Sequence, residues 1–108
     1  MPNRILLDKD LTDAYEPIEK YALEEIVVKM TITIINKHAS KALKYKIIAY
    51  PDKNDATYTV TLVPETTLAA LAAPVTETLT DPYDAILIQM KNAATGETST
   101  GKIVINWV

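Results

Sequence analysis

The chain has little of several residue types that carry chemistry in other proteins. Its 108 residues include no cysteine, no phenylalanine, one histidine and two glycines. Without cysteine it has no disulfide and no thiolate for catalysis or metal binding. Gly96 and Gly101 lie too near the C-terminal end to build a glycine-rich phosphate-binding loop. No apolar stretch is long enough to cross a membrane, and charged residues come too early for a signal peptide, so we expect neither.

The residues that are abundant favour β-structure. Hydrophobic side chains make up 48% of the chain and are mostly aliphatic, accompanied by fourteen threonines and six tyrosines. Isoleucine, valine, threonine and tyrosine suit the half-buried pleated surface of a sheet. The net charge is −3 with acids and bases interspersed, and the chain lacks the basic stripe typical of nucleic-acid-binding proteins. Lysines alternate with other residues over 41–46, which favours a solvated strand edge over a phosphate-binding groove. We therefore expect no nucleic-acid partner.

Alternating apolar and polar residues predict three strands, at residues 28–34, 43–50 and 57–63. Side chains in a strand point to opposite faces in turn, so this period of two gives each strand one buried face. A helix could not separate the two sets. The expected inward residues are Val28, Met30, Ile32 and Ile34 in the first strand, Leu43, Tyr45, Ile47 and Ala49 in the second, and Tyr58, Val60 and Leu62 in the third.

The remaining segments complete an all-β domain. Alanine and leucine between Pro64 and Pro74 predict a short helical crossover at residues 66–72. Further strands are expected at residues 75–79, 85–91 and 102–108, with turns at proline, asparagine and aspartate clusters. Residues 1–24 form an N-terminal arm that supplies the first edge strand or lies along a neighbouring subunit, and residues 25–108 form the sandwich. About seven short strands predict an antiparallel β-sandwich, although a closed barrel is not excluded.

The C-terminal third, residues 79–108, resembles the end of a fibronectin type III or related immunoglobulin-like module. In Leu-Thr-Asp-Pro-Tyr at 79–83, Tyr83 is similar to the tyrosine corner that opens that family's penultimate strand. Residues 86–97, Ile-Leu-Ile-Gln-Met-Lys-Asn-Ala-Ala-Thr-Gly-Glu, are similar to the penultimate strand and its following turn. The family's early core tryptophan is absent from residues 27–34. The resemblance implies an immunoglobulin-like strand arrangement.

No constellation of residues predicts catalysis. His38 is the only histidine, and its turn between Lys37 and Lys41 indicates a solvated position. Neither Ser40 nor Ser99 lies in a Gly-x-Ser-x-Gly elbow, so nothing predicts an activated nucleophile. Glu77 and Asp84 are carboxylates on or near neighbouring strands, but a glycosidase cleft needs a larger fold. We expect no enzymatic activity and no cofactor.

Two oxygen-rich segments are candidates for calcium. The first, residues 8–13, alternates Asp8, Asp10 and Asp13 with other residues, and the second contains Asp52, Asn54 and Asp55. The first lacks the bend glycine and the distal glutamate of an EF-hand loop. Both are more simply explained as polar turns, and we assign no metal site.

Aromatic residues on the surface indicate an interface. Tyr15, Tyr21, Tyr50 and Trp107 are the expected interface residues, since aromatic side chains are enriched where proteins associate. The alternative is that they close the two ends of the core.

The resemblance implies a structural or assembly protein of a bacteriophage or archaeal virus particle, such as a capsid decoration or tail component. Its partners would be further copies of itself in a homo-oligomer or the major capsid or tail protein, and its location the virion. The alternative is a binding or adhesion module from a larger cell-surface or secreted protein.

Overall fold

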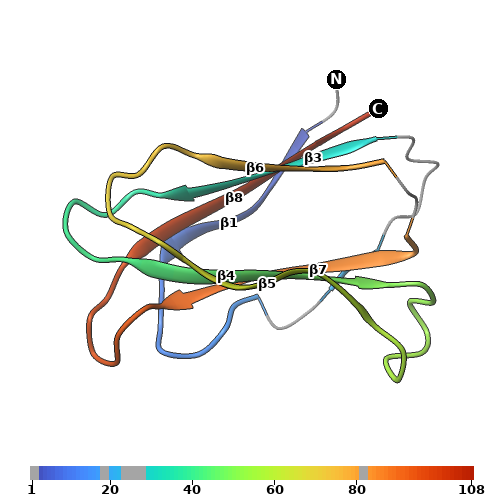
Figure 1. The fold of residues 1–108 in the computed structure, drawn as a ribbon, viewed down its shortest axis with the longest axis horizontal. Coiled ribbons are helices and arrows are strands. Elements are labelled where there is room, and N and C mark those ends of the chain that lie inside the picture. Colours follow the sequence, from blue (N-terminus) through green and yellow to red (C-terminus); the bar gives the residue numbers. More distant parts are fainter. Residues whose placement is uncertain (1–2, 18–19, 23–28, 81–82) are drawn as a thin grey trace.

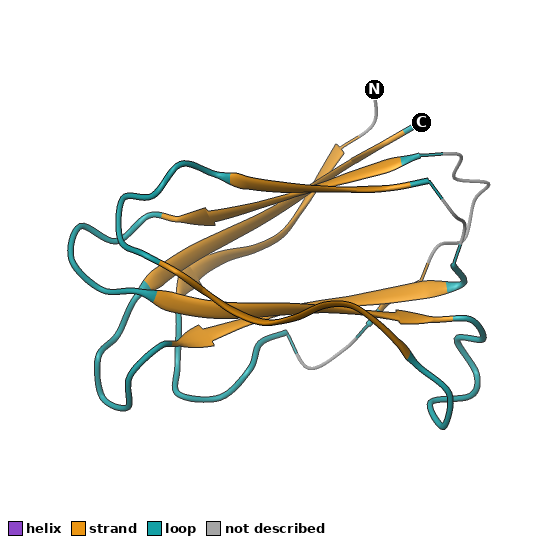
Figure 2. Cartoon of the chain, in the orientation of Figure 1, coloured by secondary structure: helices purple, strands orange, loops and turns teal. Residues whose placement is uncertain are grey.

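The computed structural model describes residues 3–17, 20–22, 29–80 and 83–108. Val28, expected to begin a strand, lies outside these residues. The described residues form eight strands. Figure 2 shows these strands joined by loops, with no helix among the described residues. The strands are β1 (Asn3–Asp10), β2 (Tyr21–Ala22), β3 (Met30–Asn36), β4 (Leu43–Tyr50), β5 (Val60–Leu68), β6 (Val75–Leu79), β7 (Ala85–Asn92) and β8 (Thr100–Trp107).

The strands form two four-stranded sheets that pack face to face (Figure 1). Sheet 1 has the order β1-β8-β3-β6 and sheet 2 the order β2-β7-β4-β5, and every neighbouring pair is antiparallel. The first strand pairs with the last, β2 with β7, β3 with β6 and β4 with β5. A long antiparallel hairpin rolled up in this way into two sheets is the eight-stranded jelly roll. The all-β sandwich expected from the sequence is confirmed, and this strand order refines it.

The strand order corrects the arrangement that the resemblance implied. In an immunoglobulin sandwich the last two strands are neighbours in one sheet. Here β7 lies in sheet 2, whereas β8 lies in sheet 1 between β1 and β3. The resemblance depended on a tyrosine near a corner and on one turn. Local features of this kind do not determine which distant strands pair, so the immunoglobulin-like order is wrong for this chain.

The core lies between the two sheets and follows the predicted alternation. In β3 and β4 the inward residues are buried and their neighbours half-buried, as expected over residues 30–34 and 43–50. Burying one large aliphatic side chain contributes roughly 1.5–3 kcal/mol, so this aliphatic layer is the main source of stability. The isoleucine and leucine residues with no exposed surface are Ile32, Ile34, Leu43, Ile47, Ile86, Ile103 and Ile105.

The expected helix at residues 66–72 is wrong. Residues 66–68 belong to β5, where Thr66 and Thr67 pair with Tyr45 and Lys44 of β4. The following residues turn tightly, with Leu71 at a φ of 56°. Only the residues between Leu68 and Pro74 remain for a helix. Forming the first turn of so short a helix costs more free energy than its few hydrogen bonds return. Pairing with β4 therefore prevails over the helical preference of alanine and leucine.

The inward face of the third predicted strand is also wrong. Tyr58 precedes β5 and is 71% exposed, and Val60 is 39% exposed. Only Leu62 packs partly against the core. The pairing of β5 with β4 shifts register around Ile47, and such bulges change which face a residue occupies.

Residues 3–10 do not extend away as a free arm. They form edge strand β1, which pairs with β8 of the same chain from Asn3 opposite Asn106 to Asp10 opposite Thr100. Of the two roles expected for this segment, the structure contains the first edge strand. A register shift between Ile5 and Leu7 leaves Leu6 without a partner in β8.

Candidate functional site

The four predicted interface aromatics lie in three places. Tyr15 and Tyr50 lie on the outer side of sheet 2, where lysine ammonium groups approach both rings. Tyr21 lies in β2 beside β1, and Trp107 is near the end of β8; both pack against the core. All four side chains are half-buried. The structure therefore brings Tyr15 and Tyr50 onto one surface but does not gather the whole set.

Sheet 2 carries a cluster of cations on its outer side, which we call the lysine face. It consists of Tyr15, Lys44, Lys46, Glu65 and Lys91. Lys44 and Lys46 occupy the outward positions of β4, because the alternate residues of that strand fill the core. Lys91 of β7 lies directly opposite Lys44 in the strand pairing. Three cations and one acid thus share one surface of a chain whose net charge is −3.

Tyr15 lies at the centre of the lysine face. The Nζ atoms of Lys46 and Lys91 lie 4.3 and 4.7 Å from the centre of its ring. This is the range in which an ammonium group is attracted to the face of an aromatic ring. Glu65 accepts ion pairs from Lys44 at 3.3 Å and from Lys91 at 3.9 Å. These side chains therefore contact one another and form one continuous cluster.

The titration of the lysine face follows from these contacts. Burial, followed by the negative charge of Glu65, raises the pKa of Tyr15 to about 12. The Tyr15 hydroxyl is shielded from solvent and has no hydrogen-bond partner of good geometry among the described residues. The Glu65 carboxylate is nevertheless close enough to raise its pKa. The Lys44 ammonium group, with Lys91 assisting, lowers the pKa of Glu65. Glu65 is therefore ionised and Tyr15 neutral at neutral pH.

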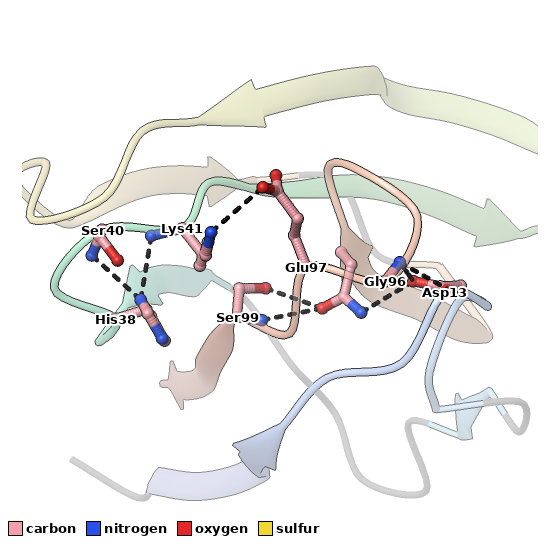
Figure 3. A network of polar contacts seen from close by, with 8 residues as sticks. Asp13, His38, Ser40, Lys41, Gly96, Glu97 and Ser99 are labelled. Carbon is pink, nitrogen blue, oxygen red and sulfur yellow. Dashed lines mark hydrogen bonds and ion pairs between the residues drawn. The ribbon is translucent and has the colours of Figure 1, made fainter.

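At one end of the sandwich a polar network joins the loop after β1 to the turn between β7 and β8 (Figure 3). The Asn92 side-chain amide donates to Asp13 at 3.0 Å, and its oxygen accepts from the Ser99 backbone nitrogen at 2.9 Å and the Ser99 hydroxyl at 3.1 Å. Asp13 also accepts a hydrogen bond from the Gly96 backbone nitrogen at 3.1 Å. Since Ser99 is fully buried and Asn92 nearly so, this network is structural.

The polar residues considered for catalysis make hydrogen bonds and ion pairs that stabilise turns and loops. His38 accepts hydrogen bonds at Nδ1 from the backbone nitrogens of Ser40 and Lys41, at 3.0 and 2.9 Å (Figure 3). It therefore orders its own turn. Ser99 is buried and donates to Asn92, as described above. Lys41 and Glu97 form an ion pair of 3.1 Å between two loops. None of these contacts places a hydroxyl against the histidine.

The two aspartate-rich segments lie at opposite ends of the sandwich (Figure 1). Within the first segment the carboxylates have different partners: Asp8 pairs with Lys37, and Asp10 accepts from Thr100. Asp52 and Asp55 accept from backbone nitrogens within their own turn. Among the described residues no group of three or more histidine, cysteine, aspartate or glutamate side chains is arranged to hold a metal ion.

No protein-family model, curated protein or solved structure matches the chain. In the part of the chain that the structure describes, no helix is long and apolar enough to cross a membrane.

The lysine face was only partly visible in the sequence. The alternation in residues 43–50 places Lys44 and Lys46 outward, and this is confirmed. That Lys91 and Glu65 join them depends on the pairing of β4 with both β7 and β5. That Tyr15 lies over these lysines depends on a loop conformation that no local pattern signals.

Proposed function

We propose that the chain is a non-enzymatic structural protein of a virus particle, such as a capsid decoration or tail component of a phage. The observation that carries this proposal is the jelly-roll strand order, which recurs in viral capsid domains. One fold serves many functions, so the proposed function also depends on the residues at the surface.

The lysine face is the surface that we assign to the partner. Its three lysines and one glutamate give it a positive balance on an acidic chain, so it complements an acidic surface of a neighbouring subunit. Aromatic and cationic side chains held in place before binding lose little entropy when a partner docks. The neighbouring subunit is another copy of the chain or the major capsid or tail protein.

The edges of the sheets favour association by faces over strand addition. β1 contains a bulge and the charged residues Arg4 and Lys9, β5 contains Pro64, and β6 has 5 residues. Bulges, charges, proline and short length are the devices by which edge strands avoid pairing with other chains.

Light scattering over a concentration series tests self-association. The expected result is a discrete closed oligomer for the natural chain and a monomer for the double variant K46E/K91E. The matched variant K29E/K53E makes the same change of charge away from the lysine face and should keep the oligomer. A natural chain that stays monomeric at every concentration contradicts self-association.

Particles purified from the source culture test the virion assignment directly. Mass spectrometry should find the chain in the particle fraction at a fixed ratio to the major capsid or tail protein. Its absence from purified particles contradicts the assignment.

A further inference from the structure

The outer edge of β6, which we call the β6 edge, is a regular open edge of sheet 1. The pairings of β1 and β5 are interrupted by register shifts, and β2 has 2 residues. In contrast, β6 pairs with β3 over all 5 of its residues without a shift. In the described part of the chain no strand pairs with the other side of β6. An edge with a row of unpaired backbone groups is a template for a strand of another chain.

One charged side chain of β6 points inward. Glu77 lies directly opposite Ile32 of β3, and residues paired in this way share a face of the sheet. Ile32 is fully buried between the sheets. The alternate neighbours of Glu77 in β6, Val75 and Leu79, pack partly against the same core. Glu77 therefore extends its carboxylate between the sheets at their open side, where the residue is half-buried.

The surroundings of Glu77 contain hydroxyl groups and no counter-charge. Tyr45 of β4 points inward from sheet 2, and burial, followed by the negative charge of Glu77, raises the pKa of its phenol. Thr66 of β5 lies opposite Tyr45 and shares its inward face. Among the described residues Glu77 forms no ion pair. A carboxylate without a cation relies on the solvent that remains at this open side.

The sequence of β6 is nearly self-complementary. Val-Thr-Glu-Thr-Leu at residues 75–79 reads almost the same in both directions. Antiparallel pairing of two copies about Glu77 would place each threonine opposite a threonine and each valine opposite a leucine. Cross-strand pairs of this kind stabilise a sheet. The contact would join the two copies of sheet 1 about a two-fold axis, which is the commonest symmetry of homo-oligomers.

The centre of this contact is unfavourable. Glu77 would lie opposite Glu77 of the second copy, and like charges directly opposite each other destabilise a pair of strands. The second copy would also remove solvent from both carboxylates, and neither has a cation to replace it. Inward-pointing charges are one of the devices by which edge strands avoid pairing with other chains.

We propose that Glu77 closes the β6 edge to a second copy of the chain. One carboxylate decides whether the two copies of sheet 1 join, because the other four residues of β6 favour the contact. This inference goes beyond the proposed function and does not depend on it, since β6 belongs to sheet 1 and the lysine face lies on the outer side of sheet 2.

Light scattering and amide NMR over a concentration series test this role. All variants carry K46E/K91E, so that association through the lysine face does not contribute. Adding E77V should raise the self-association constant at least tenfold and make the amide signals of Thr76 and Thr78 shift with concentration. Adding T78V instead makes the outward face of β6 more apolar but leaves the charge, and it should change neither readout. Unchanged self-association with E77V, or an equal rise with T78V, overturns the proposal.

A charge exchange tests the register of the contact. In the variant K46E/K91E/E77K a lysine would lie opposite a lysine, so this variant alone should self-associate no more than K46E/K91E. Mixed in equal amounts, the two variants should form a one-to-one dimer, because a carboxylate then lies opposite an ammonium group. A mixture whose mean mass equals that of its separate components overturns the pairing of Glu77 with its own copy.

Discussion

The side chains of Asp13 and Asn92 are 79 positions apart in the sequence and are joined by a hydrogen bond of 3.0 Å. This bond connects the loop after β1 to the last residue of β7. Through the oxygen of Asn92 it continues to Ser99 at the start of the return to β8. The pairing of β1 with β8 brings these segments together, and the Asp13–Asn92 contact closes the end of the sandwich over the core.

The variant N92A should unfold at lower denaturant concentration than the natural chain. It removes both bonds to Ser99 and the bond to Asp13, and it leaves buried donors of Ser99 without an acceptor. A buried donor left without a partner costs about 1–3 kcal/mol. Urea denaturation followed by tryptophan fluorescence measures the change. The control N54A replaces an exposed asparagine and should change the free energy of unfolding by less than about 0.5 kcal/mol. Equal effects of the two changes would show that the network contributes nothing.

Acid should weaken the same contact. The hydrogen bond from Asn92, followed by that from the Gly96 backbone, lowers the pKa of Asp13 below its ordinary value of 3.8. The unfolded chain therefore takes up this proton first as the pH falls. The stabilisation is complete above the unfolded pKa and is lost as the pH falls through the lower folded pKa. The difference in unfolding free energy between the natural chain and D13N should shrink as the pH falls below the unfolded pKa and through the lower folded pKa of Asp13. A difference that does not vary with pH would contradict this account.

The sequence predicted those parts of the fold that depend on local alternation. Residues 30–34 and 43–50 have the buried faces expected of them, since a period of two leaves no other face for their aliphatic side chains. The strand expected at residues 85–91 is β7, and its residues from Ala85 to Met90 are buried. The alternation failed at β5, where register shifts against β4 place Val63, and not Leu62, opposite the buried Ile47. Val60 is exposed at the start of the strand, and Tyr58 precedes it.

What the sequence did not contain was the order of the strands. Whether β8 pairs with β7 or with β3 depends on how the two sheets share the core, and the local pattern of Ile103 and Ile105 is the same in either case. The lysine face depends on that order, because it requires β4 between β5 and β7.

A side chain at Gly101 should destabilise the fold. A Cβ atom there would lie 2.6 Å from the Met90 sulfur and 3.3 Å from Leu11 Cδ1, and both neighbours are buried. Adding an atom to a close-packed core costs roughly 1–3 kcal/mol, which is the loss expected for G101A in urea denaturation.

A double-mutant cycle separates crowding from other causes. The change M90A should cost less stability in the G101A background than in the natural chain, because the shortened side chain leaves room for the new methyl group. The variant G96A serves as the contrast. No atom lies within 4 Å of its new Cβ, and its cost arises from a φ of 77°. It should show no coupling to M90A, and additive effects of G101A and M90A would contradict the crowding account.

Replacing Tyr15 by phenylalanine should leave the chain as stable as before or more stable. The variant Y15F keeps the ring beside Lys46 and Lys91 but removes a buried hydroxyl that has no hydrogen-bond partner among the described residues. Such a group costs about 1–3 kcal/mol where it is fully buried, so its removal should not destabilise the fold.

Absorbance titration provides a second readout, because the phenol of Tyr15 has a pKa of about 12. An unfolded tyrosine ionises near pH 10, so the fold favours the neutral phenol, and this contribution is lost as the pH rises through 12. The variant should lack the titration step near 12, and E65Q should move that step to lower pH by removing the nearby negative charge. A loss of stability in Y15F would show that the hydroxyl has a partner on the lysine face after all.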